Sequence, residues 1–527
     1  MYPPDETTTQ PILPPPCQDC PLSKPRPPRI PLHLPNARPM VAKRKFTSDA
    51  IEQVVQRVTA VMADRDLAAL FRNCYPNTLD TTVAWFHDDH ANDYKRPRSF
   101  IVTGDIPAMW IRDSTQQLLP YLPFAPLDYD LQNLILGAIK VQATYLAYNP
   151  YANAFRMPPD GPKPVHHQTH GDRVVPPYDP SIVWEAKYEL DSLAAFFKLS
   201  TEYVRITKDS IRLIQDKEWL QAVHRVLDLI EEQMRGTWEE PRRSKEKEPH
   251  YSLVNTTSLK GVPLGEGYRF LRTTDIPTET LGQDGLGGVV KRCGLVKSAF
   301  RPSDDATTMP FLIPANAMIS VALQDLAMLF EQVSYKDPLA VLPILAERCR
   351  SLGLTIREAV FRHGVVQHPK YGQVFAYEVD GFGGQMLMDD ANIPSLLSLP
   401  LLGFISKRDP LYLNTRKYVL SDDNPWFFRG SQIEGVGGPH VGRDMVWPMS
   451  AMVRARTATT ADEVLDALEM LKRTTAGTGL MHESVNKNNA TDFTRSWFSW
   501  ANGLFGETIL EVLEEWPEVI ETIQPAD

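Results

Sequence analysis

The chain has few cysteines and no long hydrophobic segment. Its 527 residues include five cysteines, too few and too scattered for a disulfide framework: Cys17, Cys20, Cys74, Cys293 and Cys349. The first residues, Met-Tyr-Pro-Pro-Asp, lack the basic stretch and apolar run of a secretory signal, and no later stretch approaches transmembrane length. We therefore expect a protein of the reducing cytoplasm that has no membrane partner.

The chain also lacks an excess of positive charge. Its formal net charge is −10 and its pI is near 5.7, without a basic stripe, which argues against nucleic acid as a partner. No Walker loop and no Gly-x-Ser-x-Gly elbow occurs, and the glycines of 282–288 have neither fingerprint's spacing. The 10 Trp and 18 Tyr suit a neutral ligand such as a sugar, because flat ring faces pack against C–H faces.

No internal linker divides the chain, and we expect one large domain behind a tail. Residues 1–43 carry 13 of the 45 prolines and no apolar period, so this segment cannot bury enough surface to offset the entropy of ordering. We interpret 1–43 as a disordered tail and 44–527 as the folded domain. The charged run 236–250 is expected to be a solvated surface insertion.

Helical periodicity dominates the predicted domain. Asp49 and Glu52 have the spacing of a capping box, and apolar residues from Ile51 to Leu67 follow at helical spacing. Similar patterns predict helices at 129–148, 183–206, 217–234, 315–333, 339–360, 443–457, 460–474 and 493–515, and shorter ones at 114–122, 391–402 and 410–419. The alternating segment 365–382 predicts a β-hairpin. Paired helices in a ring, with function in the loops at one end, fit this pattern.

Two loops far apart in the sequence carry candidate catalytic carboxylates. Arg301-Pro302-Ser303-Asp304-Asp305 supplies two, and Gly479-Leu480-Met481-His482-Glu483-Ser484 supplies one. Hydrolysis of a glycosidic bond needs one carboxylic acid and one carboxylate on opposite faces of the sugar. Adjacent aspartates do not easily both ionise in a closed site, so one is expected to keep a raised pKa. The competing interpretation is that Ser303 and the aspartates cap a helical turn.

A third segment, 103–114, is rich in polar and aromatic groups and precedes an apolar run. Arg112 and Asp113 could bind sugar hydroxyls while Trp110 offers a stacking face. The alternative is a helix start capped by Asp113 or Ser114, with Arg112 in a structural ion pair.

Three residues further along the chain are weaker candidates for the site. Glu507, inside the helix predicted at 493–515, ranks below Glu483 as a base. Trp497 and Trp500 are three residues apart and are expected to be core rather than sugar-stacking residues.

Histidine clusters raise the alternative of a metal-dependent hydrolase. They are His87-Asp88-Asp89-His90 and His166-His167-Gln168-Thr169-His170, and the second lies between Pro-rich pieces without the Glu of a His-Glu-x-x-His helix. The pair Cys17 and Cys20 has no second Cys or His pair at zinc-finger spacing. We therefore expect neither a metal nor a cofactor.

Several ordered motifs together resemble glycoside hydrolase family 125, the metal-independent exo-α-1,6-mannosidases. The resemblance extends from about residue 51 to 507 and is carried by 104–114, 184–193, 300–305, 388–395, 438–440 with 447–448, 481–484 and 497–505. The Pro-rich tail and the charged insertion depart from the family pattern.

The resemblance implies an (α/α)6 barrel and inversion at the anomeric carbon. It implies an Asp acid in the Arg-Pro-Ser-Asp-Asp motif, for which we favour Asp304 over Asp305, and Glu483 as base. It also implies that Asp105, Arg112, Asp113, Asp390 and His440 line a terminal-mannose pocket. The substrate would be a mannose-containing oligosaccharide, from mannan or an N-glycan. A metal-dependent glycan hydrolase and a non-catalytic mannoside-binding protein are the alternatives, and the sequence leaves the oligomeric state open.

Overall fold

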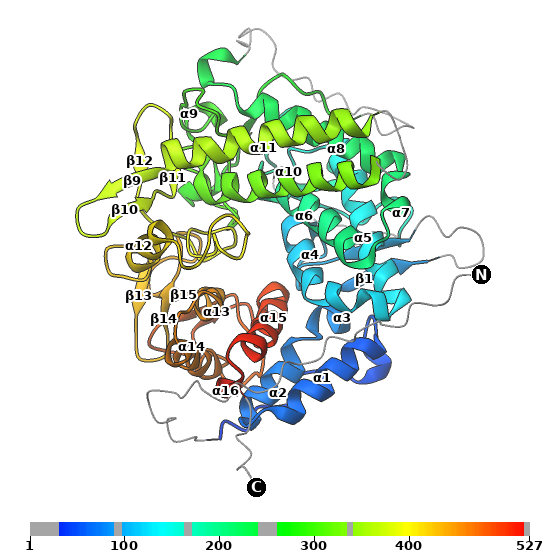
Figure 1. Cartoon of the computed structure of the whole chain (residues 1–527), viewed down its shortest axis with the longest axis vertical. Helices are drawn as coiled ribbons and strands as arrows, with labels where there is room; N and C mark the ends of the chain where they lie inside the picture. The colour runs from blue at the N-terminus through cyan, green and yellow to red at the C-terminus, as the bar shows by residue number, and fades with distance from the viewer. Residues whose placement is uncertain (1–30, 89–96, 163–170, 241–260, 335–340, 521–527) are drawn as a thin grey trace.

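The computed structural model describes residues 31–88, 97–162, 171–240, 261–334 and 341–520. Helices predominate, and Figure 1 shows them arranged in a ring in which the first helices lie beside the last. The α-helices are α1 (Asp49–Val61), α2 (Arg65–Cys74), α3 (Asn77–Thr81), α4 (Ile111–Leu118), α5 (Tyr129–Tyr148), α6 (Leu190–Thr207), α7 (Ile211–Ile214), α8 (Lys217–Gln233), α9 (Gly282–Gly285), α10 (Ile313–Ser334), α11 (Leu342–Gly364), α12 (Pro410–Val419), α13 (Pro448–Arg456), α14 (Ala461–Arg473), α15 (Ser499–Glu515) and α16 (Pro517–Ile520).

Short strands and 3-10 turns fill the connections between helices. The strands are β1 (Val83–His87), β2 (Arg98–Ile101), β3 (Met109–Trp110), β4 (Ala154–Phe155), β5 (Arg173–Val175), β6 (Val183–Glu185), β7 (Arg269–Leu271), β8 (Phe311–Leu312), β9 (Val365–His368), β10 (Gly372–Phe375), β11 (Glu378–Val379), β12 (Gln385–Met386), β13 (Phe427–Arg429), β14 (Glu434–Val436), β15 (Met445–Val446), β16 (Ser484–Asn486) and β17 (Phe493–Thr494). The 3-10 helices are η1 (Val41–Lys43), η2 (Leu119–Leu127), η3 (Thr237–Glu239) and η4 (Pro277–Glu279). All strand pairs in the described ranges are antiparallel.

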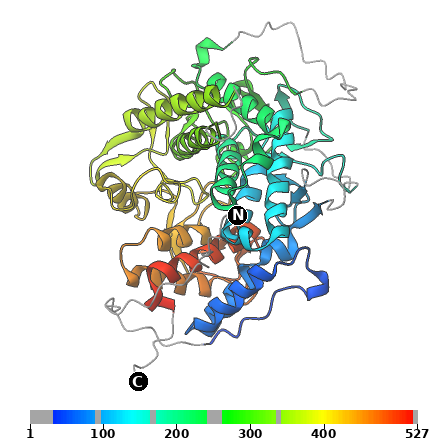
Figure 2. The ribbon, with the colours of Figure 1, turned by 45° about the vertical axis from the view of Figure 1, so that its right-hand side comes forward.

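Helix contacts run around most of the ring, from α10 to α13. Helix α4 contacts α6, which contacts α10, and on the other side α13 contacts α15, which contacts α4. Further helices pack against them, since α5 lies against α6, α11 against α10 and α14 against α13, and α8 packs on α5. Figures 1 and 2 both show α15 beside the N-terminal helices α1 and α2. A Cβ on Gly506 in α15 would lie 2.3 Å from the Tyr75 ring, so only glycine permits this approach.

Short strands precede several of these helices and shift their first residues. The predicted starts at 183, 443 and 493 are wrong: α6, α13 and α15 begin at Leu190, Pro448 and Ser499. The residues in front of them form β6, β15 and β17, which pair with β4 and β16. Side chains at these strand-to-helix junctions are therefore held by both elements, and the candidate site lies among them.

The first helix is shorter than the apolar pattern suggested. Helix α1 ends at Val61, and Leu67 belongs to α2. The first N–H groups of α2 donate to the Asp64 side chain. The N-cap of α1 is Ser48, whose Oγ accepts from the Ile51 N–H at 3.3 Å, so the capping box assigned to Asp49 was wrong by one residue. Glu52 pairs with Arg38 and Arg44 instead.

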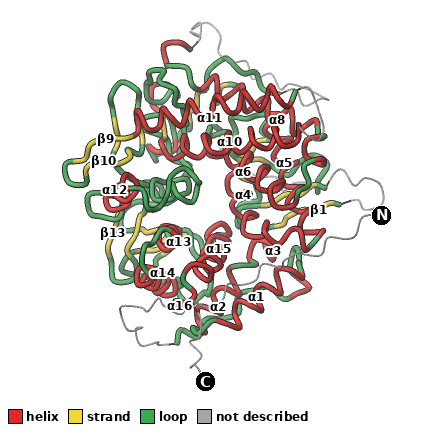
Figure 3. Tube along the Cα trace, in the orientation of Figure 1, coloured by secondary structure: helices red, strands yellow, loops and turns green. Residues whose placement is uncertain are grey.

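The predicted helix at 391–402 is wrong, and Figure 3 draws the segment leading to α12 as loop. It is a series of turns such as Ser398 N–H to Ser395 O at 3.2 Å. Pro394 and Pro400 have no N–H to donate, and the hydroxyls of Ser395 and Ser398 bond to nearby backbone atoms in place of a helical ladder.

Two other predictions can be compared with described elements, the hairpin within 365–382 and the absence of a stretch of transmembrane length. The hairpin predicted within 365–382 is confirmed, since β9 pairs with β10 from Val365 opposite Phe375 to His368 opposite Gly372. The expectation that no stretch reaches transmembrane length was wrong, because α10 is long and apolar enough to qualify. However, 78% of its apolar window is buried, and α10 packs against α6 and α11 as a core helix.

The predicted tail and insertion lie partly outside the described residues, namely at 1–30 and 241–260. The last part of the tail assignment is described and contacts the domain. The Leu32 N–H donates to Asp66 at 2.7 Å, and Arg38 pairs with Asp80 at 2.7 Å. Among the described residues, contacts with the domain are therefore present from Leu32 onward.

Candidate active site

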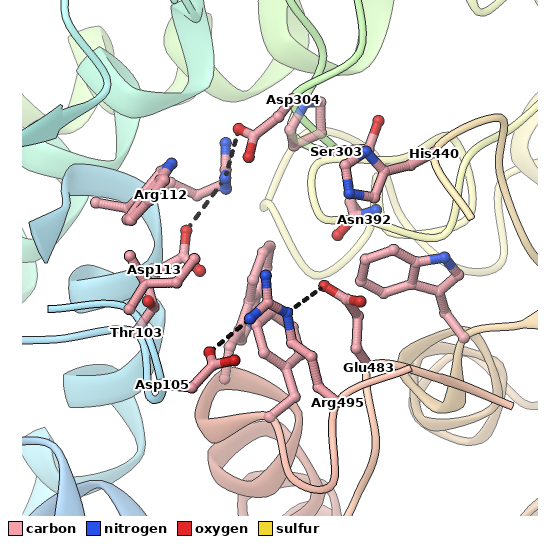
Figure 4. A pocket seen from close by; sticks show the side chains of 16 residues that line it. Thr103, Asp105, Arg112, Asp113, Ser303, Asp304, Asn392, His440, Glu483 and Arg495 are labelled. Atoms are coloured by element: carbon pink, nitrogen blue, oxygen red, sulfur yellow. Dashed lines mark hydrogen bonds and ion pairs between the residues drawn. The ribbon is translucent and has the colours of Figure 1, made fainter. Parts of the chain in front are cut away.

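A pocket of about 490 Å³ lies where loops from distant parts of the chain meet. It is lined by Thr103, Asp105, Ile106, Trp110, Arg112, Asp113, Pro302, Ser303, Asp304, Asn392, His440, Trp447, Glu483, Arg495, Phe498 and Trp500. Figure 4 shows Asp304 and Glu483 reaching this space from opposite sides of the view. The predicted site residues Asp105, Trp110, Arg112, Asp113, Asp304, His440 and Glu483 are thus brought together.

A tight turn separates the two adjacent aspartates. The Arg301 N–H donates to Asp305 O at 2.7 Å and the Asp304 N–H to Arg301 O at 2.9 Å, while Asp304 has a φ of +66°. This left-handed conformation, which Asp tolerates better than most residues, places the Asp304 carboxylate at the pocket. Asp305 is fully buried and does not line the pocket, so the structure separates the two candidates.

A buried ion pair anchors this turn. Arg301 donates from Nε to Glu378 Oε1 at 2.6 Å, with 4% and 0% of the two side chains exposed. The other oxygen, Glu378 Oε2, accepts from the backbone N–H groups of Thr308 and Met309 at 3.0 Å. Strand β11, which carries Glu378, thereby fixes both ends of the loop that presents Asp304.

Glu483 is held at the pocket by Arg495. Arg495 Nε donates to Glu483 Oε1 at 3.0 Å, and its Nη1 donates to Asp105 Oδ1 at 2.5 Å (Figure 4). The neighbouring His482 is buried, stacks on Phe493 at 3.8 Å between ring centroids, and bonds through its ring nitrogens to backbone oxygens. Glu483 is therefore held in two ways: the preceding His482 is fixed by its own contacts, and one carboxylate oxygen of Glu483 accepts from Arg495.

Arg112 is both an ion-pair partner and a pocket residue. Its Nη1 lies 2.6 Å from Glu189 and 3.3 Å from Asp191, and its Nη2 lies 3.1 Å from Asp113 and 3.6 Å from Asp304. The predicted cap by Asp113 or Ser114 was wrong, since the N-cap of α4 is Trp110. Ser114 Oγ instead donates to Trp110 O at 2.6 Å.

Asp390, a predicted binding residue, is not brought to the pocket surface. It is fully buried and accepts hydrogen bonds from Ser303 Oγ at 2.9 Å and from the Asn392 amide at 3.0 Å. Ser303 and Asn392 line the pocket, so Asp390 lies behind them and holds both.

The pKa of Asp304 is shifted in the direction opposite to the raise expected for one of the two aspartates. Burial alone would raise it, but the charges of Lys187 and Arg112 and a hydrogen bond with Glu189 outweigh burial and hold the pKa of Asp304 below its usual range. Burial raises the pKa of Asp113 to about 6, against the opposing effect of Arg112. The site therefore favours an ionised Asp304 when no sugar is bound.

His440 faces the buried Asp305 across the pocket wall, with Nδ1 at 3.6 Å from Oδ1. Burial lowers the pKa of His440, but the Asp305 carboxylate more than compensates and raises that pKa to about 9. At neutral pH the ring is therefore a cation that faces the carboxylates of the pocket.

Several buried polar groups at the pocket have no partner among the described protein atoms. They are the indole N–H groups of Trp110, Trp447 and Trp500 and the hydroxyl of Thr103. Buried donors are normally satisfied, so these four groups suit a ligand rich in hydroxyls. The ring of Trp500 also lies 5.6 Å from the Arg112 guanidinium, which corrects its interpretation as a core residue alone.

Sequence reasoning missed Thr103, Ile106, Pro302, Ser303, Asn392, Trp447, Arg495, Phe498 and Trp500 as lining residues. All but Arg495 lie within segments that the sequence marks as motifs, so membership of a motif was the available signal. Arg495 had none, because its contact with Asp105 spans 390 residues.

Of the competing site candidates, Glu507 is described and lies away from the pocket. Glu507 pairs with Arg456 at 2.8 Å and does not line the pocket. Cys17, Cys20, residues 89–90 of the first histidine cluster and all of the second lie outside the described residues.

Comparisons with known proteins agree with this geometry. A family model described as metal-independent alpha-mannosidase (GH125) matches residues 64–510. The meiotically up-regulated gene 157 protein of Schizosaccharomyces pombe is 46% identical over 492 residues, which is 93% of this chain and 91% of that protein.

A solved structure is also similar to this chain. A Streptococcus pneumoniae protein, described as a metal-independent alpha mannosidase in a non-productive substrate complex with alpha-1,6-mannobiose, has 30% identity and a TM-score of 0.75. The match covers 89% of this chain and 99% of that one. With a helical fold, a pocket that unites two carboxylate loops, and a family match over most of its length, this chain belongs to glycoside hydrolase family 125, the metal-independent α-mannosidases.

Proposed function

We propose that the protein releases terminal α-1,6-linked mannose from mannan or N-glycan oligosaccharides with inversion of configuration. The observation that carries this proposal is the meeting of Asp304 and Glu483, from loops almost 180 positions apart in the chain, at one pocket. Asp304 protonates the glycosidic oxygen, and Glu483 takes a proton from the water that attacks the anomeric carbon. Inversion requires the carboxyl groups to be about 6.5–9.5 Å apart, which leaves space for that water.

The remaining pocket groups suit a mannose ring. Arg112 and Asp113 present donors and an acceptor, and the unpartnered indole N–H groups can donate to hydroxyl oxygens. His440, a cation at neutral pH, can hydrogen-bond an oxygen of the sugar. The Streptococcus pneumoniae relative, bound to an α-1,6-mannobiose, supports this choice of linkage.

We also propose that the helices form an (α/α)6 barrel. The chain of contacts from α10 through α6 and α4 to α15 and α13 supports an inner ring of helices. The turn series at 391–402 would take the place of an inner helix between α10 and α13. Active-site loops would then lie at one end of the barrel.

The test is mannose release from α-1,6-mannobiose in the presence of a chelator, by wild type and Glu483→Gln. Loss of the base is expected to lower kcat about 10²–10⁴-fold, the usual contribution of general acid–base catalysis. Glu507→Gln is the matched control, because that carboxylate pairs with Arg456 away from the pocket, and it is expected to retain wild-type kcat.

Three other outcomes would overturn the proposal. Release that survives Glu483→Gln would assign the base to another carboxylate. Release by wild type that the chelator abolishes would favour a metal-dependent hydrolase. Binding of mannobiose by a folded wild type without release would indicate a non-catalytic mannoside-binding protein.

A further inference from the structure

A general acid must carry a proton, yet Asp304 faces the cations Arg112 and Lys187. These charges favour the ionised carboxylate, which has no proton to give. The question of where the acid's proton resides rests on the proposed function of Asp304. The motif 184–193, to which the proposed function assigns no role, lies directly behind this residue and offers an answer.

Glu189 is a buried carboxyl group that lies beside Asp304. It is the N-cap residue of α6, and its side chain is fully buried. Asn153 Nδ2 donates to Glu189 Oε1 at 2.9 Å and reaches Asp304 Oδ1 at 3.4 Å, so one amide bridges both carboxyls. Two carboxyls that share one amide in this way do not easily both ionise, which favours a single proton between them.

Local charge shows that the surroundings cannot leave every carboxyl ionised. Among the described residues, the groups that face Glu189 are Arg112 from α4, Asp191 from α6, Lys187 from the segment before α6, Asp304 from its loop, and Tyr268 just before β7. Asp113 lies on the other side of Arg112, and Glu185 shares the Asn153 amide with Glu189. Glu185 is matched by Arg272 at 2.8 Å, and the cationic His440, which also acts on Asp304, is matched by Asp305 at 3.6 Å. Arg112 and Lys187 then remain against the carboxyls of Asp113, Glu189, Asp191 and Asp304, and unpaired buried charge is costly.

The proton is best placed on Glu189. Burial raises the pKa of Glu189 well above its usual range, reinforced by Asp304 and Asp191 and opposed by Arg112. Asp304 is the more exposed partner, with 25% of its side chain accessible, and can be solvated as an anion. The raised pKa of Glu189 and the lowered pKa of Asp304 agree with a neutral Glu189 that donates to an ionised Asp304.

We propose that Glu189 is a positioning residue that stores the acid's proton and passes it to Asp304 when the substrate binds. The O–H bond of Glu189 breaks as that of Asp304 forms. Asp304 then gives this proton to the glycosidic oxygen as the C–O bond breaks, while Glu483 takes a proton from water. Afterwards the pair Glu189 and Asp304 regains one proton from solvent and Glu483 releases one, so protons balance over the cycle.

Difference infrared spectroscopy tests the stored proton without any need for activity. A band from the C=O stretch of a protonated carboxyl is expected in wild type at neutral pH, absent in Glu189→Gln and kept in Asp191→Asn. Asp191 is the matched control because it is also fully buried and faces Arg112, at 3.3 Å. A band that survives in Glu189→Gln, or that disappears only in Asp191→Asn, would overturn the proposal.

The pH profile tests whether this proton is the one used. In wild type the infrared band is expected to vanish with the same pH dependence as the basic limb of kcat/KM, a comparison that needs no variant. Glu189→Gln keeps the shape of the side chain and a hydrogen-bond donor. It is nevertheless expected to move the basic limb of the kcat/KM profile down by about one pH unit or more, because Asp304, which lies beside two cations, is then the only acid. Its kcat on α-1,6-mannobiose is expected to fall about 10²-fold or more.

Other results separate this inference from the proposed function. An unchanged pH profile in a folded Glu189→Gln protein would reduce Glu189 to a hydrogen-bonding spacer and overturn the inference, whereas mannose release would still stand. If wild type releases no mannose, the proposed function fails, and the infrared band still decides whether Glu189 holds a proton.

Discussion

Asp304 and Asp305 are neighbours in the chain but lie in different surroundings. A turn closed by the Arg301 N–H and Asp305 O gives Asp304 its positive φ and directs it to the pocket, while Asp305 faces His440 from behind the wall. Asp304 is thus suited to touch a substrate, and Asp305 to set the charge of His440, which lines the pocket. The same separation explains why two adjacent carboxyls coexist at one site.

The charge on His440 is expected to depend on Asp305. In wild type, NMR titration of the ring is expected to give a pKa near 9, and in Asp305→Asn that pKa is expected to fall, because burial then acts without the compensating carboxylate. His440→Gln assigns the resonance. A ring that titrates at the same pH in wild type and Asp305→Asn would contradict this account.

This pair also makes stability depend on pH. The pKa of a histidine in an unfolded chain is about 6.5, lower than that of folded His440. The stabilisation from His440 is therefore complete below pH about 6.5 and is lost as pH rises through about 9. Wild type is expected to lose unfolding free energy across this window and Asp305→Asn to lose less, as measured by urea denaturation.

At the scale of elements, amphipathic helices were the most predictable part of the fold. The ranges 129–148 and 410–419 coincide with α5 and α12, because uninterrupted apolar periodicity settles a helix locally. Helix starts at 183, 443 and 493 were wrong because strand pairing between distant segments converts those residues to β6, β15 and β17. Such pairing is tertiary and leaves little local signal.

The loop that carries Asp304 depends on strand β11. Glu378→Gln is expected to lower the free energy of unfolding by about 3–5 kcal/mol, because it leaves Arg301 as a buried, unmatched charge. It is also expected to lower kcat, since the loop that presents Asp304 loses its anchor. Thermal and urea denaturation together with mannose release check both effects.

An exposed ion pair provides the control for this variant. The Glu239 and Arg292 side chains are 45% and 58% exposed, so Glu239→Gln is expected to change stability by less than about 1 kcal/mol. Equal losses from Glu239→Gln and Glu378→Gln would show that the buried pair has no special role in holding the loop.

At the scale of the whole molecule, ring closure creates the site. Helix α15 contacts α2, α3 and α4, and this closure brings Arg495, just before α15, to Asp105, 390 residues earlier. Motif residues could be selected from the sequence because they resembled a family. Arg495 could not, because it lies outside those motifs and its contact with Asp105 forms only when both ends of the chain meet. Asn392 and Trp447 belong to such motifs, but the fold decides which motif residues face the pocket.

The central claim is that Asp304 and Glu483 act on opposite faces of one sugar, as acid and base. The most direct test is proton NMR of mannose released by wild type from α-1,6-mannobiose, recorded before the anomers equilibrate. Inversion predicts that β-mannose appears first and α-mannose grows only by mutarotation. If α-mannose appears first, the reaction proceeds with retention, which requires carboxyls about 5–5.5 Å apart and a covalent intermediate, and the account is contradicted.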